Sequence, residues 1–243
     1  MLDRVTITGA DDNTDILEML DLALSYPWLE FGILVSRSRE GSPRYPSRQW
    51  QEQLLKSAHR MNLSMHVCGH WARSIFPGTV DWAELPPIRT VAQRIQINGP
   101  VPVDLDALGA CNPGTQFIVQ YPRAASYLHA CQAVGINCAP LFDESGGEGR
   151  QVRAWSDIPD CDYVGYAGGI GPDDVKETVG SIMTFRQGPF WIDSEGRMRD
   201  DQDRLDMRKV NRHLEVCEGI INAPAFSGLM EAAVRREQAR RKA

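Results

Sequence analysis

The sequence lacks the marks of membrane, secreted and fibrous proteins. No apolar run approaches the ~18 residues that a membrane-spanning helix needs, and the N-terminal residues lack the basic-then-apolar pattern of a secretory signal. The six cysteines are scattered and include no C-x-x-C pair, which favours reduced thiols in a cytoplasmic protein. Basic residues are not in excess, since 26 Lys and Arg against 32 Asp and Glu give a net charge of −6. We therefore expect neither nucleic acid nor a membrane as partner.

Motifs for several kinds of cofactor and intermediate are also missing. The turn Gly9–Asp12 after the first predicted strand is acidic and does not match G-x-G-x-x-G, so a dinucleotide site is not indicated. No lysine ends a predicted strand, which leaves a Schiff-base mechanism without an obvious nucleophile. The triplet His66, Cys68 and His70 has ligand chemistry but no partner cluster. We expect no cofactor and no metal.

What the sequence does contain is an alternation of short apolar segments with longer amphipathic stretches. With 243 residues and 42% hydrophobic positions, the chain can bury one sizeable core. The period-2 and period-3.6 patterns predict strands at Val5–Thr8, Phe31–Val35, Leu63–Cys68, Ala92–Ile97, Phe117–Val119, Cys138–Phe142, Tyr163–Tyr166 and Phe190–Ile192. They predict helices at Ile16–Leu24, Arg48–Met61, Asp104–Leu108, Ala124–Val134, Asp173–Phe185 and Met207–Val216.

Eight strand-then-helix units predict an α/β fold of one closed barrel. Parallel strands need crossover helices, and eight such units in ~250 residues favour a single (β/α)8 TIM barrel. We expect the barrel to span residues 1–222 and to be followed by a C-terminal helical extension at 223–243. The basic end of that extension is either a solvated helix face or a partner contact.

In such a barrel the functional residues follow the carboxyl ends of the strands. The paired glycines Gly168 and Gly169 come after the seventh predicted strand, and Ser194 and Gly196 come after the eighth. Glycines let backbone N–H groups approach an anion closely, and these two loops commonly hold a phosphate in this fold. We therefore predict that these four residues bind phosphate, although Gly168 and Gly169 would also suit a plain tight turn. Other candidates at the same end include Gln96, Asn98, Gln120, Glu144 and Asp193.

Four stretches together resemble the phosphoribosylanthranilate isomerase family, a tryptophan-pathway TIM barrel. They run in the family's order along nearly the whole chain. They are Val5–Gly9, Ser42–Ser47 (Ser-Pro-Arg-Tyr-Pro-Ser), Leu141–Asp143 with the Gly146–Arg150 loop and Trp155, and Ala167–Pro172. The resemblance implies a barrel isomerase of the Amadori type, in which Asp143 is the general acid and Arg44 contacts the anthranilate end of the substrate.

One position departs from the family in a way that affects the chemistry. The resemblance places the general base, a cysteine, at the end of the first strand, where this chain has Thr8. A threonine hydroxyl does not titrate near neutral pH and cannot accept a proton as a thiolate does. Glu195 also replaces a second serine in the phosphate loop, and it would repel a phosphate unless Arg197 or Arg199 compensates.

His66 and Cys68 are the candidates for a replacement base. Because they alternate with Val67, both should point into the barrel. A histidine is suited to proton transfer near neutral pH, but both residues would also serve as barrel filling. Asp143 in turn is either the acid or a residue that ties down the following loop.

Three functions remain open on the sequence. The first is an acid–base isomerase acting on a small phosphorylated, sugar-derived substrate in a reaction other than the family's own. The second is an aldolase-type or other lyase reaction on the same scaffold. The third is a protein that binds a phosphorylated ligand without catalysis, because the fold alone does not fix the function.

Overall fold

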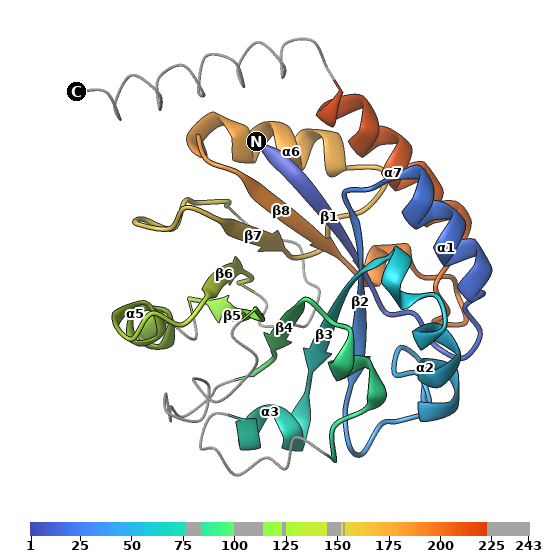
Figure 1. Ribbon diagram of the computed structural model, residues 1–243. Helices are drawn as coiled ribbons and strands as arrows, with labels where there is room; N and C mark the ends of the chain where they lie inside the picture. Colours follow the sequence, from blue (N-terminus) through green and yellow to red (C-terminus); the bar gives the residue numbers. More distant parts are fainter. Residues whose placement is uncertain (76–83, 100–113, 123–124, 145–151, 153, 223–243) are drawn as a thin grey trace.

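The eight strands of the protein form a closed parallel barrel, as predicted. The computed structural model describes residues 1–75, 84–99, 114–122, 125–144, 152 and 154–222. Each strand pairs with the next, and β1 also pairs with β8, which closes the ring (Figure 1). The strands are β1 (Leu2–Thr8), β2 (Leu29–Val35), β3 (Asn62–Val67), β4 (Arg94–Ile97), β5 (Gln116–Tyr121), β6 (Cys138–Phe142), β7 (Val164–Ala167) and β8 (Phe190–Ser194).

The helices lie around the outside of the barrel (Figure 1). They are α1 (Ile16–Ser25), α2 (Arg48–Leu55), α3 (Gly69–Ile75), α5 (Ala125–Ala133), α6 (Val175–Phe185) and α7 (Met207–Ile221), with short 3-10 turns η1 (Ala58–Arg60), η3 (Pro87–Thr90) and η4 (Gly196–Met198). Three α-helices begin at a side-chain cap, in which Asp15, Ser47 or Asp206 accepts a hydrogen bond from a first-turn N–H. None of the helices in these ranges is long and apolar enough to cross a membrane.

One predicted helix is shorter in the structure, and one helix is present that the sequence patterns do not predict. The helix predicted over Arg48–Met61 ends at Leu55, because the N–H groups of Lys56 and Ser57 turn back to carbonyls three residues earlier and tighten the chain into η1. α3 had not been predicted; it buries Trp71 and Ala72. The predicted helix Asp104–Leu108, the loop Gly146–Arg150 and the extension 223–243 lie outside the described residues.

Side-chain alternation along the strands separates an apolar outer face from a more polar interior. The outward residues, such as Met65 on β3 and Ile192 on β8, belong to the main apolar core. One part of the barrel interior is apolar as well, where Trp191 packs with Ile118, Ala139 and Leu141. This division leaves the polar inward side chains of β1 to β4 facing one another.

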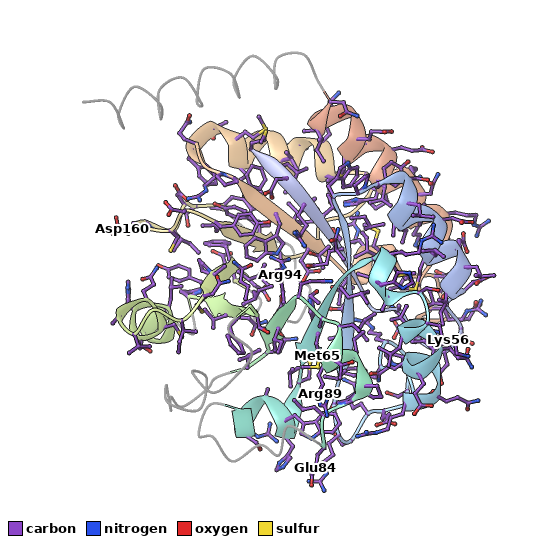
Figure 2. The ribbon with its side chains drawn as sticks, viewed as in Figure 1. Lys56, Met65, Glu84, Arg89, Arg94 and Asp160 are labelled. Atoms are coloured by element: carbon purple, nitrogen blue, oxygen red, sulfur yellow. The ribbon has the colours of Figure 1, made fainter. Side chains whose placement is uncertain are left out.

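A buried ion pair forms the floor beneath the carboxyl end of the barrel. Glu30 of β2 accepts two hydrogen bonds from the Arg94 guanidinium, at 2.6 and 2.8 Å, and one each from Arg4 and Thr6 at 2.9 Å. The Arg94 guanidinium also stacks over the Trp191 ring, 4.4 Å from its centre. Figure 2 shows Arg94 among the strands, whereas the exposed Lys56, Glu84 and Asp160 lie at the periphery. Burial alone would raise the pKa of Glu30, but the charges and hydrogen bonds of Arg94 and Arg4 outweigh it and lower this pKa to about 2.

Candidate active site

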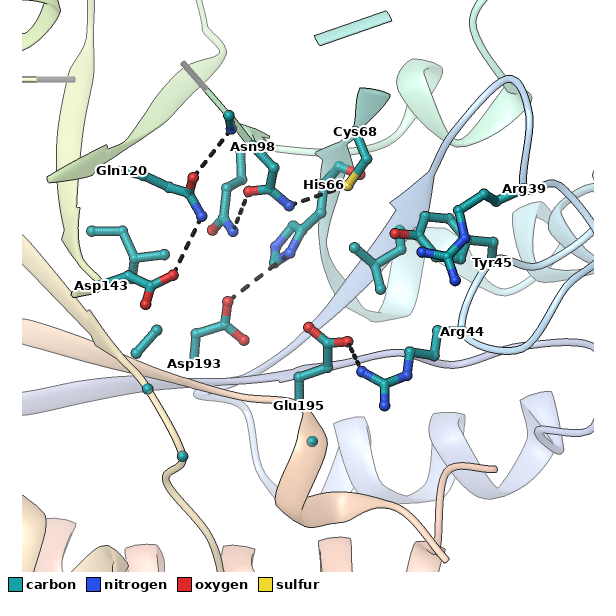
Figure 3. Close-up of a pocket in the computed structure, with 18 of the residues that line it drawn as sticks. Arg39, Arg44, Tyr45, His66, Cys68, Asn98, Gln120, Asp143, Asp193 and Glu195 are labelled. Carbon is teal, nitrogen blue, oxygen red and sulfur yellow. Dashed lines mark hydrogen bonds and ion pairs between the residues drawn. The ribbon is translucent and has the colours of Figure 1, made fainter. Parts of the chain in front are cut away.

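A cavity of about 410 Å³ opens at the carboxyl end of the barrel. Its walls combine residues from the ends of the strands with residues of the loops that follow them, as expected for a catalytic or binding site in this fold. Both polar and charged side chains face it, among them His66, Cys68, Gln120, Asp143, Asp193 and Glu195 (Figure 3).

His66 and Cys68 both line the cavity, as strand alternation predicts. The His66 ring is almost completely buried, and its Nε2 lies 3.0 Å from the hydroxyl of Ser64, two residues earlier on the same strand. Burial lowers the pKa of His66 to about 4. The imidazole is therefore neutral at physiological pH and has little affinity for a further proton.

The thiol of Cys68 is also in its neutral form. Its Sγ accepts a hydrogen bond from Nδ2 of Asn98 at 3.3 Å, and the Tyr45 hydroxyl is a second partner (Figure 3). Burial nevertheless raises the pKa of Cys68, because it penalises the thiolate more than these hydrogen bonds favour it. His70, the third member of the triplet, lies in α3. Within the described residues, no group of three or more His, Cys, Asp or Glu side chains is arranged to hold a metal ion.

Thr8 is held against Asp193, the last inward-facing residue of β8. The Thr8 hydroxyl donates a 2.7 Å hydrogen bond to Oδ1 of Asp193, and the pairing of β1 with β8 brings the two side chains together. Oδ2 of Asp193 lies 4.0 Å from Nδ1 of His66 (Figure 3). Thr8 itself is enclosed and does not line the cavity, whereas Asp193 does.

The carboxyl of Asp193 has a strongly perturbed acidity. Burial raises its pKa to about 7, and the charges of Glu195 and Glu30 act in the same direction. The Thr8 hydrogen bond and the charge of Arg94 oppose this effect. Perturbed carboxyls in a cleft are typical of functional sites. Its position after the predicted strand Phe190–Ile192 puts Asp193 at this end of the barrel, but no sequence pattern gives it a role.

Gly32 makes the approach of these groups possible. It lies on β2, between Thr8 of β1 and His66 of β3. A Cβ at this position would come within 2.3 Å of the Thr8 hydroxyl and 2.7 Å of Cε1 of His66. Only a residue without a side chain leaves room for both.

Asp143 faces the same cavity from the end of β6, as expected. It is almost fully buried, and Nε2 of Gln120 lies 3.4 Å from its Oδ2. The adjacent Glu144 is exposed, which agrees with the prediction that only the first of the two carboxylates looks into the barrel. Asp143 and Asp193 thus place two carboxyl groups on the walls of one cavity (Figure 3).

Arg44 lines the cavity but is already paired with carboxylates. Its Nη1 lies 2.8 Å from Glu195, while its Nε and Nη2 bind Asp203. These partners raise the pKa of Arg44, so it stays charged. Its backbone is in the left-handed region, with φ of 73°, and its N–H donates to Asp11. The cation that compensates Glu195 is therefore Arg44.

The two arginines expected to compensate Glu195 have other partners. Arg197 lies 3.7 Å from Asp174, and Arg199 binds Asp11, Asp203 and the carbonyl of Gly9. Asp203 comes from a loop without hydrophobic periodicity, so no sequence signal connected it with the site. Arg37 is exposed outside the cavity, and Arg39 lies over the Tyr45 ring at the rim.

The glycine turns predicted to bind phosphate reach the cavity, but the Ser194 side chain does not. Gly168, Gly169 and Gly196 line it together. Gly168 and Gly169 have φ of 129° and 69°, which side-chain-bearing residues rarely adopt. The hydroxyl of Ser194 points away from the barrel interior, 3.4 Å from Nε2 of His213 on α7. Strand alternation explains this, because Asp193 faces inward and its neighbour must face the helices.

Comparisons with known proteins support the fold. No protein-family profile and no curated protein sequence matches the chain. Among solved structures, TrpF from Jonesia denitrificans is 14% identical with a TM-score of 0.58, covering 90% of this chain and 98% of that one. Phosphoribosyl anthranilate isomerase from Thermus thermophilus is also 14% identical, with a TM-score of 0.58, covering 89% and 99%.

A second kind of barrel enzyme is similar at a lower level. Phospho-2-dehydro-3-deoxyheptonate aldolase (DAHP synthase) from Thermotoga maritima is 11% identical with a TM-score of 0.53, covering 90% of this chain and 69% of that one. At these identities the likeness shows a shared fold. The neighbours include an isomerase and an aldolase-type synthase.

Proposed function

We propose that this barrel is a phosphoribosylanthranilate-isomerase-like enzyme that isomerises a small phosphorylated, sugar-derived substrate by acid–base chemistry. The observation that carries the proposal is the cavity itself, into which the carboxyl of Asp143 and the turns of Gly168, Gly169 and Gly196 all face. A phosphate on the glycine turns would anchor the substrate, with backbone N–H groups as donors. Asp143 would then donate a proton to an oxygen or nitrogen of the sugar moiety.

The reaction we propose is not the ordinary one of the resembled family. Thr8 stands at the cysteine position, is enclosed, and donates its hydroxyl to Asp193. It cannot act as a thiolate base. The sequence offered His66 or Cys68 instead, and both line the cavity. On the scattered cysteines we also propose a cytoplasmic location.

The phosphate site is tested by thermal unfolding in increasing inorganic phosphate. A ligand that binds only the folded state raises the melting temperature in a concentration-dependent way. We expect such a rise, and we expect it to be lost when Gly169 is replaced by a bulky residue such as Val. Absence of any rise in the unmodified protein would refute a phosphate anchor.

The acid–base chemistry is tested in D2O by proton NMR. The protein is incubated with phosphoribosylanthranilate and with a series of aldose and ketose phosphates, and loss of the signal at the carbon next to the carbonyl or imine carbon is followed. We expect isomerisation of a member of the series, and a loss of about 10²–10⁴-fold in Asp143→Asn. Glu144→Gln, which changes the exposed neighbour, is the matched control. Phosphate binding without exchange in any substrate would favour a binding protein.

Thr8→Cys separates the family reaction from a different one. Since Thr8 cannot serve as the base, the unmodified protein should not turn over phosphoribosylanthranilate, and the variant should gain activity if the rest of the site is the family's. Turnover by the unmodified protein would contradict the role given to Thr8. Inactivity of both would indicate a different substrate.

A further inference from the structure

The cavity holds a buried carboxyl whose position fits proton transfer and which the proposed chemistry has not yet used. Asp193 is 8% exposed, lines the cavity and has one oxygen fixed by the 2.7 Å hydrogen bond from Thr8. Its other oxygen lies on the side of His66, at 4.0 Å from Nδ1 (Figure 3). The carboxyl is therefore oriented from one side and not closed off by a short ion pair on the other.

The two other candidate bases are less suited to the role. Nε2 of His66 is occupied by the Ser64 hydroxyl, and the ring is only 1% exposed. The thiol of Cys68 accepts a hydrogen bond from Asn98, and burial disfavours its thiolate by raising its pKa. At neutral pH His66 is therefore a weak base with little exposed surface, and Cys68 is a thiol that must first lose its own proton.

We propose that Asp193 is the base that takes the carbon-bound proton of the substrate, and that Thr8 positions its carboxylate. The inference rests on the proposed function, since it assigns a missing role in that reaction. In this proposal Thr8, at the position where the resembled family has its cysteine base, orients the carboxylate of Asp193 on the neighbouring strand by a hydrogen bond. Thr8 is a positioning residue, and Asp193 is the catalytic one.

The charges around Asp193 make it a suitable base near neutral pH. Glu195 at the rim and Glu30 in the floor raise its pKa, Arg94 in the floor lowers it, and burial brings it to about 7. His66, the other titratable group beside it, is neutral because its own pKa is lowered to about 4. A carboxyl with its pKa raised this far is partly ionised near neutral pH, where a proton acceptor of matching pKa is effective.

The proton and electron balance of the step is simple. Asp193 removes the proton from the carbon next to an imine or carbonyl carbon, and the C–H electron pair forms a C=C bond. Asp143 gives its proton to the oxygen or nitrogen that receives the displaced π electrons. In the second half the hydroxyl on the carbon that lost its C–H proton gives its own proton to Asp143, and that carbon becomes a carbonyl. The electron pair of the C=C bond then takes the proton from Asp193 at the former carbonyl or imine carbon. Both residues end in their starting forms, and no oxidant or reductant is needed.

The test uses glycidol phosphate, a phosphate ester that carries an epoxide. The phosphate would occupy the glycine turns, and the base carboxylate would attack an epoxide carbon, open the ring and form an ester, while the ring oxygen takes a proton from Asp143 or water. Mass spectrometry of peptides then identifies the modified residue. We expect Asp193 to be labelled, at a rate about tenfold higher at pH 8 than at pH 6, as follows from a pKa of about 7.

Variants link the label to the roles of the two residues. Asp193→Asn should abolish labelling, whereas Asp201→Asn, which changes an exposed carboxylate outside the cavity, should not. Thr8→Val removes the hydrogen bond that favours the carboxylate, so the pH dependence of labelling should move to higher pH, and Thr8→Ser should restore it. An unchanged pH dependence in Thr8→Val would overturn the positioning role.

The remaining outcomes separate this inference from the proposed function. Labelling at Asp143, His66 or Cys68 in the unmodified protein overturns Asp193 as the base, and this result does not depend on how any variant folds. No labelling in a protein whose melting temperature rises with inorganic phosphate also overturns it. No labelling together with no response to phosphate refutes the phosphate anchor, and with it the proposed function on which the inference depends.

Discussion

Replacing Glu30 by Gln should destabilise the barrel strongly, because it leaves buried arginine charge without a counter-charge. The carboxylate is fully enclosed and accepts hydrogen bonds from Arg94, Arg4 and Thr6. Removing one partner of such a pair costs about 3–5 kcal/mol in the free energy of unfolding. The fall of its pKa from the ordinary 4.5 to about 2 independently corresponds to about 3 kcal/mol.

The stabilisation by Glu30 should decrease as the pH falls. Since the pKa of Glu30 is lower in the folded chain, its stabilising contribution is fully present above about pH 4.5 and is lost as pH falls toward 2. The difference in unfolding free energy between the unmodified protein and Glu30→Gln should therefore be about 3 kcal/mol or more at pH 6. By pH 3 it should narrow by about 2 kcal/mol.

Urea denaturation at pH 6 and pH 3 measures both quantities. Glu52→Gln, an exposed position on α2, is the control and should stay within about 0.5 kcal/mol of the parent. The double variant Glu30→Leu with Arg94→Met should recover much of the loss, because it removes both of these charges. A Glu30→Gln variant within about 1 kcal/mol of the parent at pH 6 would refute the reasoning.

Two further predictions concern the mouth of the barrel. Gly32→Ala should lower the free energy of unfolding by about 1–3 kcal/mol, because its Cβ would meet Thr8 and His66. An unchanged urea denaturation midpoint would contradict this and show that the neighbouring side chains move aside at no cost in stability. Glu195→Gln should tighten inorganic phosphate binding by about 1 kcal/mol, roughly fivefold, since a carboxylate facing the anion is removed and Arg44 keeps only Asp203 as a carboxylate partner. Titration of melting temperature against phosphate measures this, and weaker binding would mean that Glu195 favours the anion.

Local sequence patterns were sufficient for the barrel and for part of the site. Alternation along single strands placed His66, Cys68 and Asp143 at the cavity, because a period of two fixes which side chains face inward. The same rule also places the Ser194 hydroxyl outside. The prediction for Ser194 followed the position of its loop after the eighth strand, and the structure puts its side chain against α7.

Local sequence patterns do not predict contacts between segments that are far apart in the chain. The bond from Thr8 to Asp193 depends on the register between β1 and β8, which no local periodicity encodes. The pairing of Arg44 with Asp203 joins two irregular loops, where neither helical nor strand spacing operates. Burial, which sets the acidity of Asp193, is likewise a property of the whole fold.

The proposed base, Asp193, is positioned only when β8 pairs with β1 and closes the barrel. Thr8 and Asp193 are 185 positions apart, so the hydrogen bond between them forms only after nearly the entire described chain has been made and the last strand has inserted beside the first. A polypeptide that ends before β8 would lack both the carboxyl and its holder, however well its earlier units fold. The raised pKa of Asp193 is therefore expected only in a chain whose β8 has paired with β1 and closed the barrel.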